Sequence, residues 1–67
     1  MITTTARLNE GDIVRFGNKY TGYRFATIVK KEKSIKPRWY SITLYYHFAG
    51  NATEAFAANT EFVKVSA

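Results

Sequence analysis

Cationic and aromatic side chains are interleaved in the first half of this chain, and this combination is its most informative chemical feature. Eight of the ten Lys and Arg residues lie between positions 15 and 38, where only Glu32 opposes them. Cations neutralise phosphate groups and release counterions, and aromatic rings stack on unpaired bases at about 1–3 kcal/mol each. We therefore predict a surface that binds DNA or RNA, formed by these residues: Arg15, Lys19, Tyr20, Arg24, Lys31, Lys33, Lys36, Arg38, Trp39 and Tyr45.

Protein recognition is the alternative that these residue types leave open. Exposed Trp, Tyr and Arg side chains also dominate the binding energy of protein interfaces. The partner would be an acidic protein surface or a second copy of the chain, because a small β domain can extend its sheet across a partner at an exposed edge strand. A simpler interpretation is that the charge serves solubility and the rings fill the core. We expect a monomer or a weak homo-oligomer.

Catalytic chemistry is poorly supported by this composition. The chain has no cysteine and a single histidine, His47, which we expect to be exposed near a turn. The candidate acids and bases are Glu10, Asp12 and Glu54, but no spacing pairs two of them. There is no glycine-rich phosphate loop and no Gly-x-Ser-x-Gly motif. We therefore predict a non-enzymatic protein with no metal and no cofactor.

The length and the charge distribution limit the remaining possibilities. A chain of 67 residues with a formal net charge of +5 is enough for one domain, which buries only about 60% of its unfolded surface. No stretch reaches the roughly 18 apolar residues of a transmembrane helix, and the N-terminus lacks the pattern of a signal peptide. The absence of cysteine fits a reducing compartment. We expect one domain over 1–67, without membrane contact, in the cytoplasm of the cell or infected host that makes it.

The segment 39–48 has the clearest structural pattern in the chain. Its apolar and aromatic residues recur at every second position from Tyr40 to Phe48, and this alternation predicts a half-buried strand. Trp39 and Tyr45 then lie on the opposite, solvent-facing side. Two aromatic rings on the solvent-facing side of a strand are the first indication of a binding surface.

Four further strands and their connections follow from alternation and turn residues. The loop over 17–22 is bracketed by glycines, and the lysine-rich loop over 31–37 is expected to be the most mobile internal segment. Residues 2–8 alternate weakly and suit a short edge strand or a frayed tail. The alanine-rich segment 52–59 has a helical alternative. The predicted strands, with the central one, span 12–16, 23–31, 39–48, 53–57 and 61–66.

The predicted core consists of the apolar sides of these strands. Over 23–31 both sides carry apolar residues, and we place Phe25 and Ile28 in the core, which requires a β-bulge between them. Asp12 is interpreted as a turn residue. The other residues expected in the core are these: Val14, Phe16, Tyr40, Ile42, Leu44, Tyr46, Phe48, Phe56, Val63 and Val65.

The opening Leu8-x-x-Gly11-Asp12-x-Val14, with the layout that follows it, resembles SH3-like small barrels of the KOW and Tudor type. That layout is a loop, two long central strands, a glycine turn, a short strand, a one-turn connection and a closing strand. Many uncharacterised proteins encoded by bacteriophages belong to this type. The resemblance implies an all-β, five-stranded SH3-like barrel that acts as a nucleic-acid binder, a peptide binder or a structural module.

Overall fold

The computed structural model describes residues 1–65, which form six strands and one short 3-10 helix. The predicted all-β class is therefore confirmed. Ser66, at the end of the predicted last strand, lies outside the described residues. The elements are β1 (Ile2–Thr4), η1 (Thr5–Arg7), β2 (Ile13–Asn18), β3 (Gly22–Lys33), β4 (Trp39–Tyr46), β5 (Gly50–Ala57) and β6 (Glu61–Lys64).

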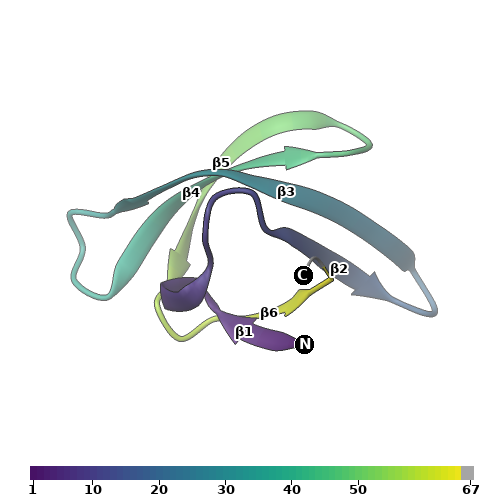
Figure 1. Ribbon diagram of the computed structural model, residues 1–67, viewed down its shortest axis with the longest axis horizontal. Helices are drawn as coiled ribbons and strands as arrows, with labels where there is room; N and C mark the ends of the chain where they lie inside the picture. The colour runs from purple at the N-terminus through teal and green to yellow at the C-terminus, as the bar shows by residue number, and fades with distance from the viewer. Residues whose placement is uncertain (66–67) are drawn as a thin grey trace.

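All six strands belong to one antiparallel sheet with the order β1-β6-β2-β3-β4-β5 (Figure 1). Strands β2 to β5 follow one another as a meander, β6 returns to the free side of β2, and β1 adds to β6. The described residues contain no ladder between β1 and β5, so the sheet curls but does not close into a barrel. The prediction of five strands in a barrel is thus confirmed only as far as its all-β class.

Two hairpin turns lie at opposite ends of β3 (Figure 1). In the β2–β3 turn Gly17 has a φ of +92°, and a Cβ there would lie 2.1 Å from the backbone oxygen of Gly22, so only glycine fits. The Asn18 side chain accepts hydrogen bonds from the backbone N–H groups of Tyr20 and Thr21. The β3–β4 loop spans only 34–38, because β3 continues to Lys33 and thus covers the first three residues of the predicted lysine-rich loop.

The buried core lies on one side of the curled sheet, and we call this side the inner face. Four other side chains, Phe16, Tyr40, Tyr46 and Phe56, are half-buried and pack against the core. The predicted positions of Val14, Ile28, Ile42 and Leu44 are confirmed. The buried apolar residues are Leu8, Val14, Ala26, Ile28, Ile42, Leu44 and Phe62.

The register of β3 differs from the prediction. Ala26 and Ile28 are buried opposite Tyr46 and Leu44, whereas Phe25 points to the other side and is 39% exposed. Residues two apart share a face, so Ala26 and Ile28 need no bulge between them. The β-bulge lies instead just after Ile28, where the pairing with β4 shifts by one residue. Placing Phe25 in the core was therefore wrong.

Three further core assignments were wrong, two in the closing strand region and one in the turn after β4. Phe62 is buried in β6, whereas Val63 pairs with Arg15 on the opposite side and Val65 is 46% exposed. The large Phe62 ring fills the space between Phe16 and Phe56, with ring centres 5.8 and 5.1 Å away, which two valines could not do. Phe48 follows the end of β4 in a turn and is 59% exposed.

Of the segment 52–59, which had the helical alternative, residues 52–57 are strand and residues 58–59 form a turn. Residues Gly50–Ala57 form β5 and pair with β4 along its whole length. Among residues 1–65, no helix is long and apolar enough to cross a lipid bilayer.

The register of β6 predicts unequal losses of stability for two neighbouring substitutions. Phe62→Ala should lower the free energy of unfolding by about 3–5 kcal/mol, because it empties a buried ring site. Val63→Ala removes two half-exposed methyl groups and should cost about 1 kcal/mol. Urea denaturation of both variants measures this difference, and a greater loss for Val63→Ala would contradict the register.

Candidate nucleic-acid interface

The side of the sheet opposite the core, which we call the outer face, carries three exposed aromatic rings. Tyr23 is 48% exposed, Phe25 39% and Tyr45 47%. Tyr23 and Phe25 alternate along β3 with the inner residues, and Tyr45 lies between the inner residues Leu44 and Tyr46 of β4. The strict alternation of side chains in strands places all three rings on one surface.

Strand pairing brings these rings next to polar side chains of β2, of β3 and of the turn after β4. Arg15 pairs with Phe25, and Thr27 pairs with Tyr45. The backbone N–H of His47 donates to the carbonyl oxygen of Phe25 over 3.0 Å, which continues the ladder beyond β4. We call this group the outer patch, and its members are Arg15, Tyr23, Phe25, Thr27, Tyr45 and His47.

Contacts within the outer patch hold its rings in place. The guanidinium carbon of Arg15 lies 4.3 Å from the centre of the Tyr23 ring, a cation–π distance. Thr27 Oγ1 and His47 Nε2 share a hydrogen bond of 2.9 Å. The rings of Tyr45 and His47 are 5.8 Å apart between centres. These neighbours restrict the side chains before any ligand binds, which lowers the entropic cost of binding.

The charge around the outer patch is positive. None of the five Asp and Glu side chains belongs to β2 or β4, and the one on β3, Glu32, lies towards its far end. Glu54 of β5 pairs with Ile42 on the inner face, where it accepts a hydrogen bond from the Tyr46 hydroxyl. Burial, together with the hydrogen bond and the charge of Glu54, raises the pKa of Tyr46 to about 12. On the strands next to Arg15, a further carboxylate on the outer side is that of Glu61, two residues from Val63 along β6.

Some residues predicted from the sequence lie on or beside the outer patch. Arg15 and Tyr45 belong to it. Lys19 and Tyr20 occupy the β2–β3 turn at the same end of the sheet, where Tyr20 is 85% exposed and the Lys19 amine lies 5.2 Å from its ring.

Arg24, another predicted residue, lies on the opposite side of the sheet from the outer patch. It pairs with Phe16 on the inner side, and its guanidinium carbon lies 4.9 Å from the centre of the Phe48 ring.

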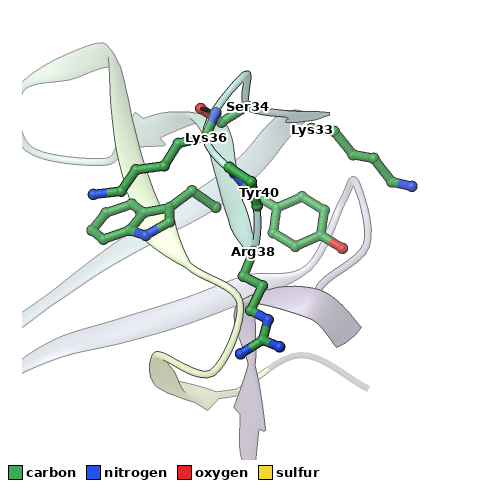
Figure 2. A pocket seen from close by; sticks show the side chains of 7 residues that line it. Lys33, Ser34, Lys36, Arg38 and Tyr40 are labelled. Atoms are coloured by element: carbon green, nitrogen blue, oxygen red, sulfur yellow. Dashed lines mark hydrogen bonds between the residues drawn. The ribbon is translucent and has the colours of Figure 1, made fainter.

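Other predicted residues gather at the opposite end, around the β3–β4 hairpin (Figure 2). They line a hollow of about 240 Å³, which also contains Ser34, Pro37 and Tyr40. Figure 2 shows Lys33 and Lys36 extending in opposite directions and Arg38 pointing away from both. The three cations therefore do not converge on one anion. The predicted residues at this hairpin are Lys33, Lys36, Arg38 and Trp39.

Lys31 is placed differently from the other cations. The shift in pairing after Ile28 turns it to the inner face opposite Ile42. Its amine donates to the carbonyl oxygens of Ala6 and Leu8 over 2.8 and 3.0 Å, and it lies 4.7 Å from the centre of the Tyr40 ring. It thereby binds carbonyl groups at the end of η1 that the helix itself leaves free.

This placement predicts a structural effect for Lys31. Lys31→Met removes two charge-assisted hydrogen bonds and should lower the free energy of unfolding by about 1 kcal/mol. Lys33→Met is the matched control, because Lys33 is exposed on the same strand. Thermal denaturation of both variants tests this, and equal melting temperatures would contradict the anchoring role.

Sequence reasoning missed four members of the outer patch: Tyr23, Phe25, Thr27 and His47. Phe25 was assigned to the core, and His47 was interpreted as a lone polar residue. The available signal was the spacing of Tyr23, Phe25 and Thr27, which places a second alternating row next to the outward side of 39–48. Pairing the two rows requires the strand register, which the sequence left ambiguous.

The described residues contain no group of three His, Asp or Glu side chains that could hold a metal ion. No family model, curated protein or solved structure matches this sequence. The outer patch must therefore be interpreted from its own chemistry.

Proposed function

We propose that this protein is a non-enzymatic module that binds single-stranded nucleic acid through the outer patch. The observation that carries the proposal is the group of exposed rings, Tyr23, Phe25 and Tyr45, beside Arg15 on one face of the sheet. Each ring offers a stacking surface for an unpaired base, and the arginine offers a charge for phosphate.

A single strand suits this surface better than a duplex. The bases of a duplex are already stacked on one another, so a row of flat rings can contact only its edges and backbone. Unpaired bases can turn outward and stack on aromatic side chains. The rings of the outer patch stand on two adjacent strands, β3 and β4, which lie about 5 Å apart. Neighbouring bases of one strand can therefore reach different rings.

A protein partner is the second candidate, and the free edge of β5 favours it. Gly50–Ala57 pairs with β4 on one side only, and it contains no proline and no lysine. A long edge of this kind can accept a strand from an acidic partner or from a second copy of the chain. The inward Glu54 opposes such pairing, because inward charges are a device that protects edges.

We also propose that the sheet is an open variant of the SH3-like small barrel. The order of strands supports this, because the closing strand β6 returns beside the opening strand β2 and the glycine turn at Gly50 begins β5. Strand β1 is an addition to that layout. Such a fold accommodates many binding functions, so the function rests on the outer patch and not on the fold.

Binding of a labelled single strand, followed by fluorescence anisotropy at about 50 mM salt, tests the proposed function. Phe25→Ala and Tyr45→Ala should each weaken binding about 5- to 150-fold, because each removes one stacking surface. Phe48→Ala is the matched control, since Phe48 is exposed but its ring contacts Arg24 and Tyr46 on the inner side. Arg15→Ala should weaken binding and also flatten its dependence on salt, because fewer counterions are released.

Two results would contradict the proposal. One is a flat titration of the parent protein with single-stranded DNA and RNA. The other is a loss of affinity in Phe48→Ala that equals the loss in Tyr45→Ala. Capture of a specific acidic protein by the parent, without any affinity for nucleic acid, would favour the second candidate.

A further inference from the structure

The outer face of β4 connects the outer patch to the far hairpin. Trp39 and Tyr45 are both at odd positions of β4 and pair with Ala57 and Asn51 of β5. Residues that are even numbers apart share a face of a strand, so the two rings stand on the same side. Six residues separate them, which corresponds to about 20 Å along the strand.

Small side chains cover the surface between these two rings, which we call the strip. On β4 it presents Ser41 and Thr43, which pair with Ala55 and Thr53 of β5. The hydroxyl oxygens of Thr43 and Thr53 lie 3.2 Å apart and share a hydrogen bond. These short side chains leave the surface of the strip flat. No bulky side chain of β4 or β5 interrupts this strip, because every outward residue between the two rings is Ser, Thr or Ala.

Two lysines flank the same strip, together with Glu32, which pairs with Ser41. Lys30 of β3 pairs with Thr43, and its amine is held 3.2 Å from Glu32. At the far end the amine of Lys36 lies 4.6 Å from the centre of the Trp39 ring. A phosphate group bound along the strip can replace the present partner of either lysine, since both amines are at the surface.

From this arrangement we propose that one single strand of nucleic acid lies along β4, with one base on Tyr45 and another on Trp39. This inference rests on the proposed function and names the path and the length of the ligand. A stacked strand rises about 3.4 Å per nucleotide. The 20 Å path therefore takes at most about seven nucleotides, and fewer when the backbone is extended, which gives about four to seven.

Trp39 is the only tryptophan of the chain, so its fluorescence reports on the far end of the path. The probes are oligothymidylates of three, six and nine nucleotides. The three-nucleotide probe reaches only the outer patch and should leave the Trp39 fluorescence unchanged. The six- and nine-nucleotide probes should quench it and bind more than about tenfold tighter, because a second ring adds its stacking contact.

Two variants separate the path from the outer patch. Trp39→Ala should weaken binding of the nine-nucleotide probe about 5- to 150-fold and leave binding of the three-nucleotide probe unchanged. Ser41→Glu places a carboxylate on the floor of the strip and should have the same selective effect through repulsion of phosphate. It tests the path even where Trp39→Ala fails to fold. Phe48→Ala is again the matched control, because Phe48 is exposed but its ring contacts Arg24 and Tyr46 on the inner side.

The outcomes distinguish failure of the path from failure of the proposed function. If all three probes bind in a Tyr45-dependent way, while Trp39 fluorescence and the Ser41→Glu variant show no dependence on length, the path is wrong and the proposed function stands. If no probe binds, both are wrong. If binding depends on Trp39 and not on Tyr45, the hairpin alone binds nucleic acid and both proposals are overturned.

Discussion

The register of β3 against β4 determines which side chains of this domain are buried and which reach solvent. Ile28 faces Leu44 in the core, and one extra residue just after Ile28 shifts the pairing beyond it. Before the shift the inner positions opposite β4 hold the apolar Ala26 and Ile28, and after it they hold Lys31 and Lys33. A slip of one residue would exchange the two faces of the strand. The core, the outer patch and the carbonyl contacts of Lys31 therefore depend on the same alignment.

The exposed rings are unexpected in so short a chain. A domain of this size has little apolar surface to bury, and burying one more large side chain would contribute about 1.5–3 kcal/mol. Even so, Tyr23, Phe25 and Tyr45 stand on the outer face while Ala26, a small residue, occupies a buried position of β3. Stability alone does not account for this arrangement. Under the proposed function, a bound base would cover the apolar surface that folding leaves exposed.

Local sequence patterns predicted the positions of the strands better than they predicted which side of each strand is buried. The alternation over 39–48 correctly placed Ile42 and Leu44 inside and Tyr45 outside, because its two sides differ in character. In β3 both sides carry apolar residues, and only the pairing with β2 and β4 shows that Phe25 points outward. In β6 the choice between Phe62 and its valine neighbours depends on the space between distant rings. Such long-range packing has no local signature in the sequence, and neither does the separation of the basic residues to opposite ends of β3.

Intermolecular nuclear Overhauser effects between the protein and a bound oligothymidylate test the central claim most directly. The claim is that nucleic acid lies on the outer face and stacks on its rings. It predicts contacts from base and sugar protons to the ring protons of Tyr23, Phe25 and Tyr45. Contacts confined to Phe48, on the other side of the sheet, or to the free edge of β5, with none to these rings, would contradict it.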